Sequence, residues 1–172
     1  GELATFADIG YGGRLRWQGR AREALVLRTA TAVTAASAPM IEALARRRIA
    51  ARRLPLGVDL RVWAPRLPLR RDAGKAARLI HVASLNEVKD QATLLRSLAA
   101  LAASGVEFEM DIVGEDTLHG AIQSMSALLG LLGKVRFLGF LTQHRLLPLV
   151  EKAHLSSFRS RHEAGPRRRH HG

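Results

Sequence analysis

The spacing of apolar positions in the first part of the chain predicts two helices and two short strands. Residues 20–28 repeat apolar side chains at helical intervals, and the β-branched run 31–35 is typical of a strand. Ser37 is expected to cap a second helix that runs to about residue 48, and a second short strand is expected at 53–56. Helix and strand therefore alternate in this part of the chain.

The pattern becomes more regular after the stretch 59–76, in which two prolines interrupt any helix or strand. We expect strands at 78–83, 108–113, 135–138 and 155–160 and helices at 90–104, 118–129 and 142–153. Four strands that alternate with three helices predict parallel βαβ units. The expected fold class is therefore α/β, with a Rossmann-like, doubly wound parallel sheet and helices on both faces.

Ligands of such sheets bind beyond the carboxyl ends of the strands. Lys89, Gly114, Gly139 and Glu163 each follow an expected strand, so we expect them to gather along that one edge. Lys89 precedes an expected helix, where its ammonium and the backbone N–H groups could both face a diphosphate. The alternative is a solvated lysine that pairs with one of the acids beside it. Gly114 permits a sharp turn and leaves room for a ligand, although a plain turn explains it equally well.

Composition limits the size and the location of the protein. With 172 residues, 47% of them hydrophobic, the chain can bury one ordinary core, or one domain and part of another. It has no apolar run of about 18 residues and no signal-peptide pattern, so we expect a cytoplasmic protein, with peripheral attachment at the inner membrane face left open. The absence of cysteine excludes disulfides and thiolate metal sites. Because the chain begins with glycine, we expect a piece of a longer protein.

The formal charge of +12 raises nucleic acid as a partner, since lysine and arginine neutralise phosphates. The arginines are spread over many segments, and aromatic residues make up only 5% of the chain, which is few for a surface that stacks bases. We therefore expect a solvated basic surface and no nucleic-acid partner. A basic α/β module that binds nucleic acid is kept as an alternative.

Six segments, in their order and spacing, make the chain resemble the retaining glycosyltransferases of group 1, glycosyltransferase family 4. They are 36–40, 55–59, 84–90, 112–116, 135–140 and 162–166. The resemblance implies the GT-B architecture, in which two Rossmann-like domains face each other across a cleft. It assigns 1–58 to the end of the N-terminal, acceptor-side domain, 59–76 to the interdomain linker, 77–166 to an incomplete nucleotide-sugar-binding domain and 167–172 to a basic tail.

The same resemblance implies a set of residues that bind the sugar donor. They are Ser84, Asn86, Lys89, Gly114, Gly139, Phe140, Glu163, Ala164 and Gly165. Lys89 and Glu163 would be catalytic. Many family members carry an arginine where this chain has Ser84, so stabilisation of the diphosphate would depend more on Lys89.

Two of these implied positions have ordinary alternatives. Glu163 resembles the first acid of the family's paired-glutamate motif and would accept hydrogen bonds from hydroxyls of the donor sugar, but it could be an exposed loop carboxylate near Arg161. Gly139 and Phe140 resemble the segment that lies against the nucleotide base, but Phe140 could equally be a core residue.

By resemblance, the intact relative transfers a hexose from UDP- or GDP-hexose to a glycan, lipid or small-molecule acceptor, with retention at the anomeric carbon and without a metal cofactor. The chain departs from the family after Pro166, because the second glutamate would fall where His171 stands. We therefore expect a truncated or frame-shifted fragment, weakly active or inactive by itself, and a non-catalytic remnant is the alternative. His170 and His171 lack a carboxylate frame and are not expected to bind metal. His81 and His154 fall in expected strands, where a packed histidine is favoured over a general base.

Overall fold

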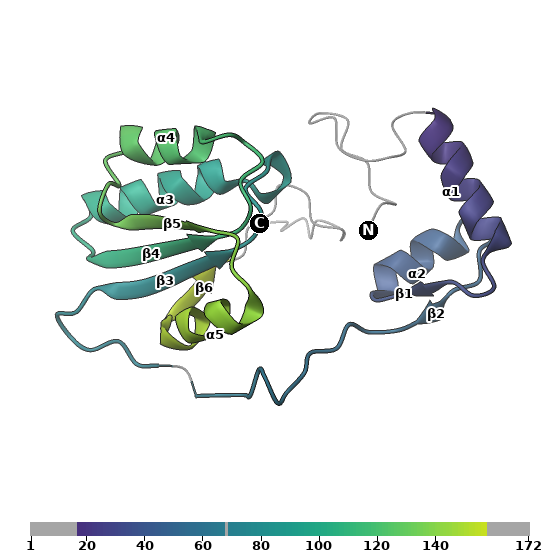
Figure 1. Ribbon diagram of the computed structural model, residues 1–172, viewed down its shortest axis with the longest axis horizontal. Helices are drawn as coiled ribbons and strands as arrows, with labels where there is room; N and C mark the ends of the chain where they lie inside the picture. Colours follow the sequence, from purple (N-terminus) through teal and green to yellow (C-terminus); the bar gives the residue numbers. More distant parts are fainter. Residues whose placement is uncertain (1–16, 68, 158–172) are drawn as a thin grey trace, which may run out of the picture. The chain divides into compact units, whose positions relative to one another are not determined.

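The computed structural model describes residues 17–67 and 69–157 (Figure 1). Among the described residues, contacts define two compact units, one up to Asp59 and one from Leu60 to Ser157. The domain limits that the family resemblance implies remain a prediction.

The first unit contains helix α1 (Trp17–Thr29), strand β1 (Thr34–Ala35), helix α2 (Ala38–Ala45) and strand β2 (Arg52–Arg53). β1 and β2 pair in parallel, with Thr34 beside Arg52 and Ala35 beside Arg53. Both strands are shorter than expected, because only two residues of each find a hydrogen-bonding partner strand. Ser37 is the N-cap residue of α2, as expected, in an extended conformation, but its side chain makes no capping hydrogen bond.

The second unit is built on a parallel sheet, as the alternating pattern predicted. Its elements are β3 (Ala77–Val82), the 3₁₀ turn η3 (Glu87–Lys89), α3 (Gln91–Ala103), β4 (Phe108–Val113), α4 (Ala121–Leu128), β5 (Val135–Gly139), α5 (Gln143–Lys152) and β6 (Leu155–Ser157). The strand order is β5-β4-β3-β6, and every neighbouring pair is parallel. Figure 1 shows α3 and α4 along one face of this sheet and α5 on the other. The α/β class with helices on both faces is confirmed.

The core lies between the sheet and the pair α3 and α4. In β4, Phe108, Met110 and Ile112 are buried, whereas Glu109 and Asp111 between them are not, which is the two-residue alternation of a strand with unlike faces. Leu94, Leu95 and Leu98 of α3 and Ile122 of α4 pack against these β4 residues. Leu85, which follows β3, and Leu131, which follows α4, complete this core. This core therefore packs β3 and β4 against the helices and fixes the position of their carboxyl ends, which carry the candidate site.

Two helices begin later than the sequence predicted, for local reasons. Asp90 has a positive φ of 49° and stands as the N-cap of α3, so the helix starts at Gln91. α4 starts at Ala121, because His119 and Gly120 have φ values of 51° and 85° and cannot continue a helix. The expected strand at 155–160 is seen at Leu155–Ser157, and the rest of it lies outside the described residues.

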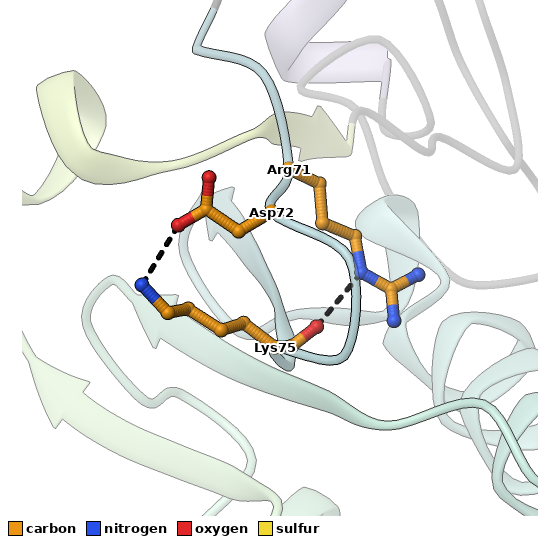
Figure 2. A network of polar contacts seen from close by, with 3 residues as sticks. All are labelled: Arg71, Asp72 and Lys75. Atoms are coloured by element: carbon orange, nitrogen blue, oxygen red, sulfur yellow. Dashed lines mark hydrogen bonds and ion pairs between the residues drawn. The ribbon is translucent and has the colours of Figure 1, made fainter.

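A tight turn leads from the proline-containing stretch into β3. Lys75 donates its backbone N–H to the carbonyl of Asp72 at 3.2 Å, and its ammonium lies 2.7 Å from the Asp72 carboxylate. Arg71 donates from Nε to the carbonyl of Lys75 at 2.8 Å, as Figure 2 shows. These side chains are exposed, so their ion pair contributes at most about 1 kcal/mol, and their role is to shape the entry into the strand.

Candidate functional site

The carboxyl ends of β3, β4 and β5 meet through backbone contacts around Gly114. Its N–H donates to the carbonyl of Gly139 at 2.9 Å, which joins the end of β4 to the end of β5. A Cβ atom at Gly114 would lie 2.0 Å from the carbonyl oxygen of Ala83 and 2.9 Å from the nitrogen of Ser84, so only glycine fits against the loop that leaves β3. The Cβ direction of Gly114 is therefore filled by the Ala83 carbonyl, and the contact of Gly114 with a ligand stays a prediction.

The loops after β3 and β4 continue side by side beyond the strands. Leu85 donates its N–H to the carbonyl of Glu115 at 2.8 Å. Thr117 donates to the Leu85 carbonyl twice, from its backbone N–H at 3.1 Å and from its hydroxyl at 2.8 Å. The loop that contains Ser84, Asn86 and Lys89 therefore rests on the neighbouring loop.

The second of these loops is itself fixed by a carboxylate. Asp116 accepts hydrogen bonds from the backbone N–H groups of Leu118 and Gly120, both at 2.8 Å, and from Nε2 of Gln123 at 3.1 Å. These contacts, the Leu118 and Gly120 N–H groups first, lower the pKa of the Asp116 carboxyl below its ordinary value, because they stabilise the charged form. The loop after β4 is thus held by an ionised aspartate.

Lys89 stands at the end of the 3₁₀ turn η3, with Asp90 between it and the first residue of α3. Its backbone N–H donates to Oδ1 of Asn86 at 3.1 Å, so Asn86 caps the turn that carries the lysine. Within residues 17–67 and 69–157, no ion pair joins Lys89 to Glu87. Lys89 is half-buried, and, beside the larger effect of burial, its charge contributes to lowering the pKa of His81 in β3.

Ser84 and Phe140 both present exposed side chains at this edge. Phe140 follows β5 and is 74% exposed, so the alternative in which it belongs to the core is wrong. The backbone of Ser84 has a partner that the sequence analysis missed: its carbonyl accepts a hydrogen bond from Nε2 of Gln91 at 2.9 Å. In the sequence, a polar glutamine at a position where α3 otherwise buries leucines could have indicated this hydrogen bond.

His81 is packed inside the sheet, as the sequence predicted, whereas His154 lies one residue before β6 and is half-buried. His81 is 1% exposed and lies with Nδ1 2.9 Å from the carbonyl oxygen of Ser157, so Nδ1 carries the proton. Burial lowers the pKa of His81; the hydrogen bond to Ser157 opposes this effect and the charge of Lys89 adds to it. His154 accepts the backbone N–H of Arg78 at Nδ1, at 2.8 Å.

The charged face of the sheet lies away from this edge. A cavity of about 300 Å³ is lined by charged side chains from the amino-terminal halves of β3, β4 and β5 and by the end of α5; they include Arg78, Glu109, Asp111, Arg136 and Lys152. Arg136 bonds Asp111 through two nitrogens, at 2.7 and 3.0 Å, which raises the pKa of the guanidinium. These residues are remote from Lys89 along their strands and belong to a separate surface.

Glu163, Ala164 and Gly165 lie outside the described residues, so their distance from Lys89 remains a prediction. The described part of the chain contains no group of three or more histidine, aspartate or glutamate side chains able to hold a metal ion. Among the helices described there, none has both the length and the apolar content needed to cross a bilayer.

Comparison with known proteins agrees with an α/β fold built on a parallel sheet. The family model described as Glycosyl transferases group 1 matches residues 70–168, more than half of the chain. The chain therefore belongs to the group 1 glycosyltransferases. EpsF of Bacillus subtilis (strain 168), named as a glycosyltransferase, is 37% identical in an alignment 105 residues long that covers 56% of this chain and 27% of EpsF.

Solved structures share the fold at low sequence identity. HepE of Anabaena, solved with UDP and glucose, has a TM-score of 0.63 at 20% identity over 82% of this chain and 41% of its own. TarM of S. aureus, solved as a mutant with Fondaparinux, alpha-GlcNAc-glycerol and UDP, has a TM-score of 0.68 at 13% identity over 95% of this chain and 31% of its own. These matches confirm the GT-B type of α/β fold. The chain spans less than a third of EpsF and less than half of either solved structure.

Proposed function

We propose that this chain carries the donor-binding part of a glycosyltransferase that moves a hexose from a nucleoside diphosphate sugar to an acceptor, with retention at the anomeric carbon. Membership of the group 1 family supports the transferase class. The HepE and TarM structures both contain UDP, which supports a uridine diphosphate sugar as donor and a glycan as acceptor. A cytoplasmic location, free or peripheral at a membrane, belongs to the same proposal.

The observation that carries this proposal is the ammonium of Lys89 at the carboxyl edge of the sheet. Its 3₁₀ turn is capped by Asn86, and its loop is bonded to the next one through Leu85. Departure of the diphosphate leaves negative charge on its oxygens, and a fixed cation stabilises that charge without having to reorganise. The proposed chemistry therefore uses Lys89 in the place that a metal ion takes in other transferases.

The other proposed contacts divide along the length of the donor. Phe140 is exposed after β5 and offers its ring to the nucleotide base, a stacking contact worth about 1–3 kcal/mol in related settings. Glu163 is proposed to accept hydrogen bonds from the sugar hydroxyls. Ser84 and the Gly114–Gly139 junction would line the diphosphate between them.

Calorimetric titration of the chain with UDP tests the lysine directly. A hydrogen bond to a charged group contributes about 1.5–3 kcal/mol, so Lys89→Ala should weaken UDP binding about 10- to 150-fold. Lys75→Ala is the matched control, because Lys75 is an exposed lysine of the same unit whose ammonium pairs with Asp72. Equal affinity of the wild-type chain and Lys89→Ala would refute the proposed donor site.

The same titration examines the absence of a metal. Binding of UDP in the presence of EDTA should match binding in its absence, since the proposed positive charge belongs to Lys89. A strong loss of affinity on adding EDTA, restored by Mg²⁺ or Mn²⁺, would contradict a metal-independent site.

A further inference from the structure

We propose that Gln91 is a positioning residue that holds Lys89 in place for the donor diphosphate; this inference rests on the proposed function. Gln91 is the first residue of α3 and only 1% exposed. Its Nε2 donates to the carbonyl oxygen of Ser84 at 2.9 Å. This side-chain hydrogen bond therefore joins the two ends of the loop from Ser84 to Gln91, which carries Lys89.

The orientation of the Gln91 amide follows from its partner. Ser84 offers a carbonyl oxygen, which can only accept, so the amide must present its nitrogen there. Its Oε1 is then buried and has no hydrogen-bond partner within the described residues. A buried amide with one unbonded atom is costly, and the same helix fills its other buried positions with Leu94, Leu95 and Leu98. The amide at position 91 is thus best explained by its hydrogen bond to the Ser84 carbonyl.

Several side chains besides Gln91 fix this loop, and Thr93 is one of them, because its hydroxyl donates to Asp90 at 3.0 Å. Thr117 bonds the Leu85 carbonyl from the neighbouring loop, and Asn86 bonds the N–H of Lys89 from within the turn. The Gln91 bond differs from these because it ties the start of the loop to the rigid helix α3. Without it, the loop could still form its turn but would be free to shift against the helix, and the ammonium would shift with it.

A small shift of this kind has a measurable effect on an ionic contact. Displacement of a binding group by about 1 Å can cost up to a hundredfold in rate, so a partial release of the loop should cost about tenfold in affinity. Gln91→Met keeps the length of the side chain and removes the hydrogen bond. We expect this variant to unfold cooperatively and to bind UDP about tenfold more weakly than the wild-type chain.

Gln123→Met is the matched control, because Gln123 on α4 also bonds a loop residue, Asp116, and also has a buried, unbonded Oε1. It supports the neighbouring loop, on which the Lys89 loop rests, so its effect on UDP affinity should be indirect and clearly smaller than that of Gln91→Met. A positioning role also predicts coupling: in the Lys89→Ala background, Gln91→Met should cause no further loss of affinity. Additive losses in the double variant, or unchanged affinity in Gln91→Met, would overturn the inference.

A measurement on the wild-type chain covers the case in which Gln91→Met does not fold. In NMR spectra, the side-chain amide signals of Gln91 should exchange slowly with solvent and should shift as UDP is added, together with those of the Lys89 loop. Fast exchange, or a Gln91 amide unmoved while Lys89 responds, would overturn the positioning role and leave the donor site intact. If the wild-type chain binds no UDP, the proposed function and this inference both fail.

Discussion

Substitution of Gly114 by alanine tests the close approach that joins the loops of the candidate site. The added Cβ would lie 2.0 Å from the carbonyl oxygen, 2.5 Å from the carbonyl carbon of Ala83 and 2.9 Å from the nitrogen of Ser84. All three atoms belong to the backbone, so no rotation of a side chain can relieve the overlap. The loops after β3 and β4 would have to separate, at the expense of the hydrogen bonds around Leu85.

The expected loss follows from these contacts. Overpacking of a rigid site costs about 1–3 kcal/mol, and a clash confined to backbone belongs at the upper end, so we expect Gly114→Ala to destabilise the chain by about 3 kcal/mol. For a unit of this size that loss lowers the melting temperature by roughly 10 to 20 °C. Binding of UDP should weaken as well, because Ser84 begins the loop that carries Lys89.

Gly105→Ala provides the control for this measurement. Gly105 has a positive φ of 80°, and no atom lies within 4 Å of the place that an added Cβ would take, so its substitution costs only the backbone strain, about 1 kcal/mol. Urea denaturation of both variants, followed by circular dichroism, compares the two losses. If Gly114→Ala is no more destabilising than Gly105→Ala, the reasoning about the backbone contact is wrong.

Two further predictions concern titration and ion pairing. The pKa of buried His81 is lowered, so the unfolded chain binds the proton more readily than the folded chain. The free energy of unfolding should therefore fall as the pH drops from about 6.5, by no more than about 1.4 kcal/mol per pH unit. His81→Gln should flatten this dependence in urea titrations, and an equal pH dependence in both proteins would contradict the role of His81. The side chain of Arg136 is 58% exposed, so Arg136→Gln should lower the free energy of unfolding by only about 0.5–1 kcal/mol in the same assay, and by less at high salt. A loss of about 3 kcal/mol or more would mean that the pair with Asp111 behaves as a buried ion pair.

The local sequence pattern was sufficient to predict the order of the strands and helices in the second unit. The strand expected at 108–113 has these limits in the structure, because its apolar residues alternate with charged ones within six positions. The position of Lys89 after β3 was equally readable, since it depends only on where one strand ends. In the first unit the same reasoning overestimated the strand at 31–35, because its length is set by the two residues of β2 that pair with it.

The sequence by itself determined the α/β alternation and the family resemblance, and it placed Lys89, Gly114 and Phe140 after strands at the carboxyl edge of the sheet, because each depends on residue types at short separations. The tertiary structure decided what touches what at that edge. Gly114 lies against the Ala83 carbonyl, which is 31 positions away in the chain, and Thr117 bonds Leu85 across 32 positions. Parallel pairing creates these neighbours only after a helix has returned the chain to the sheet, so no local pattern could reveal them.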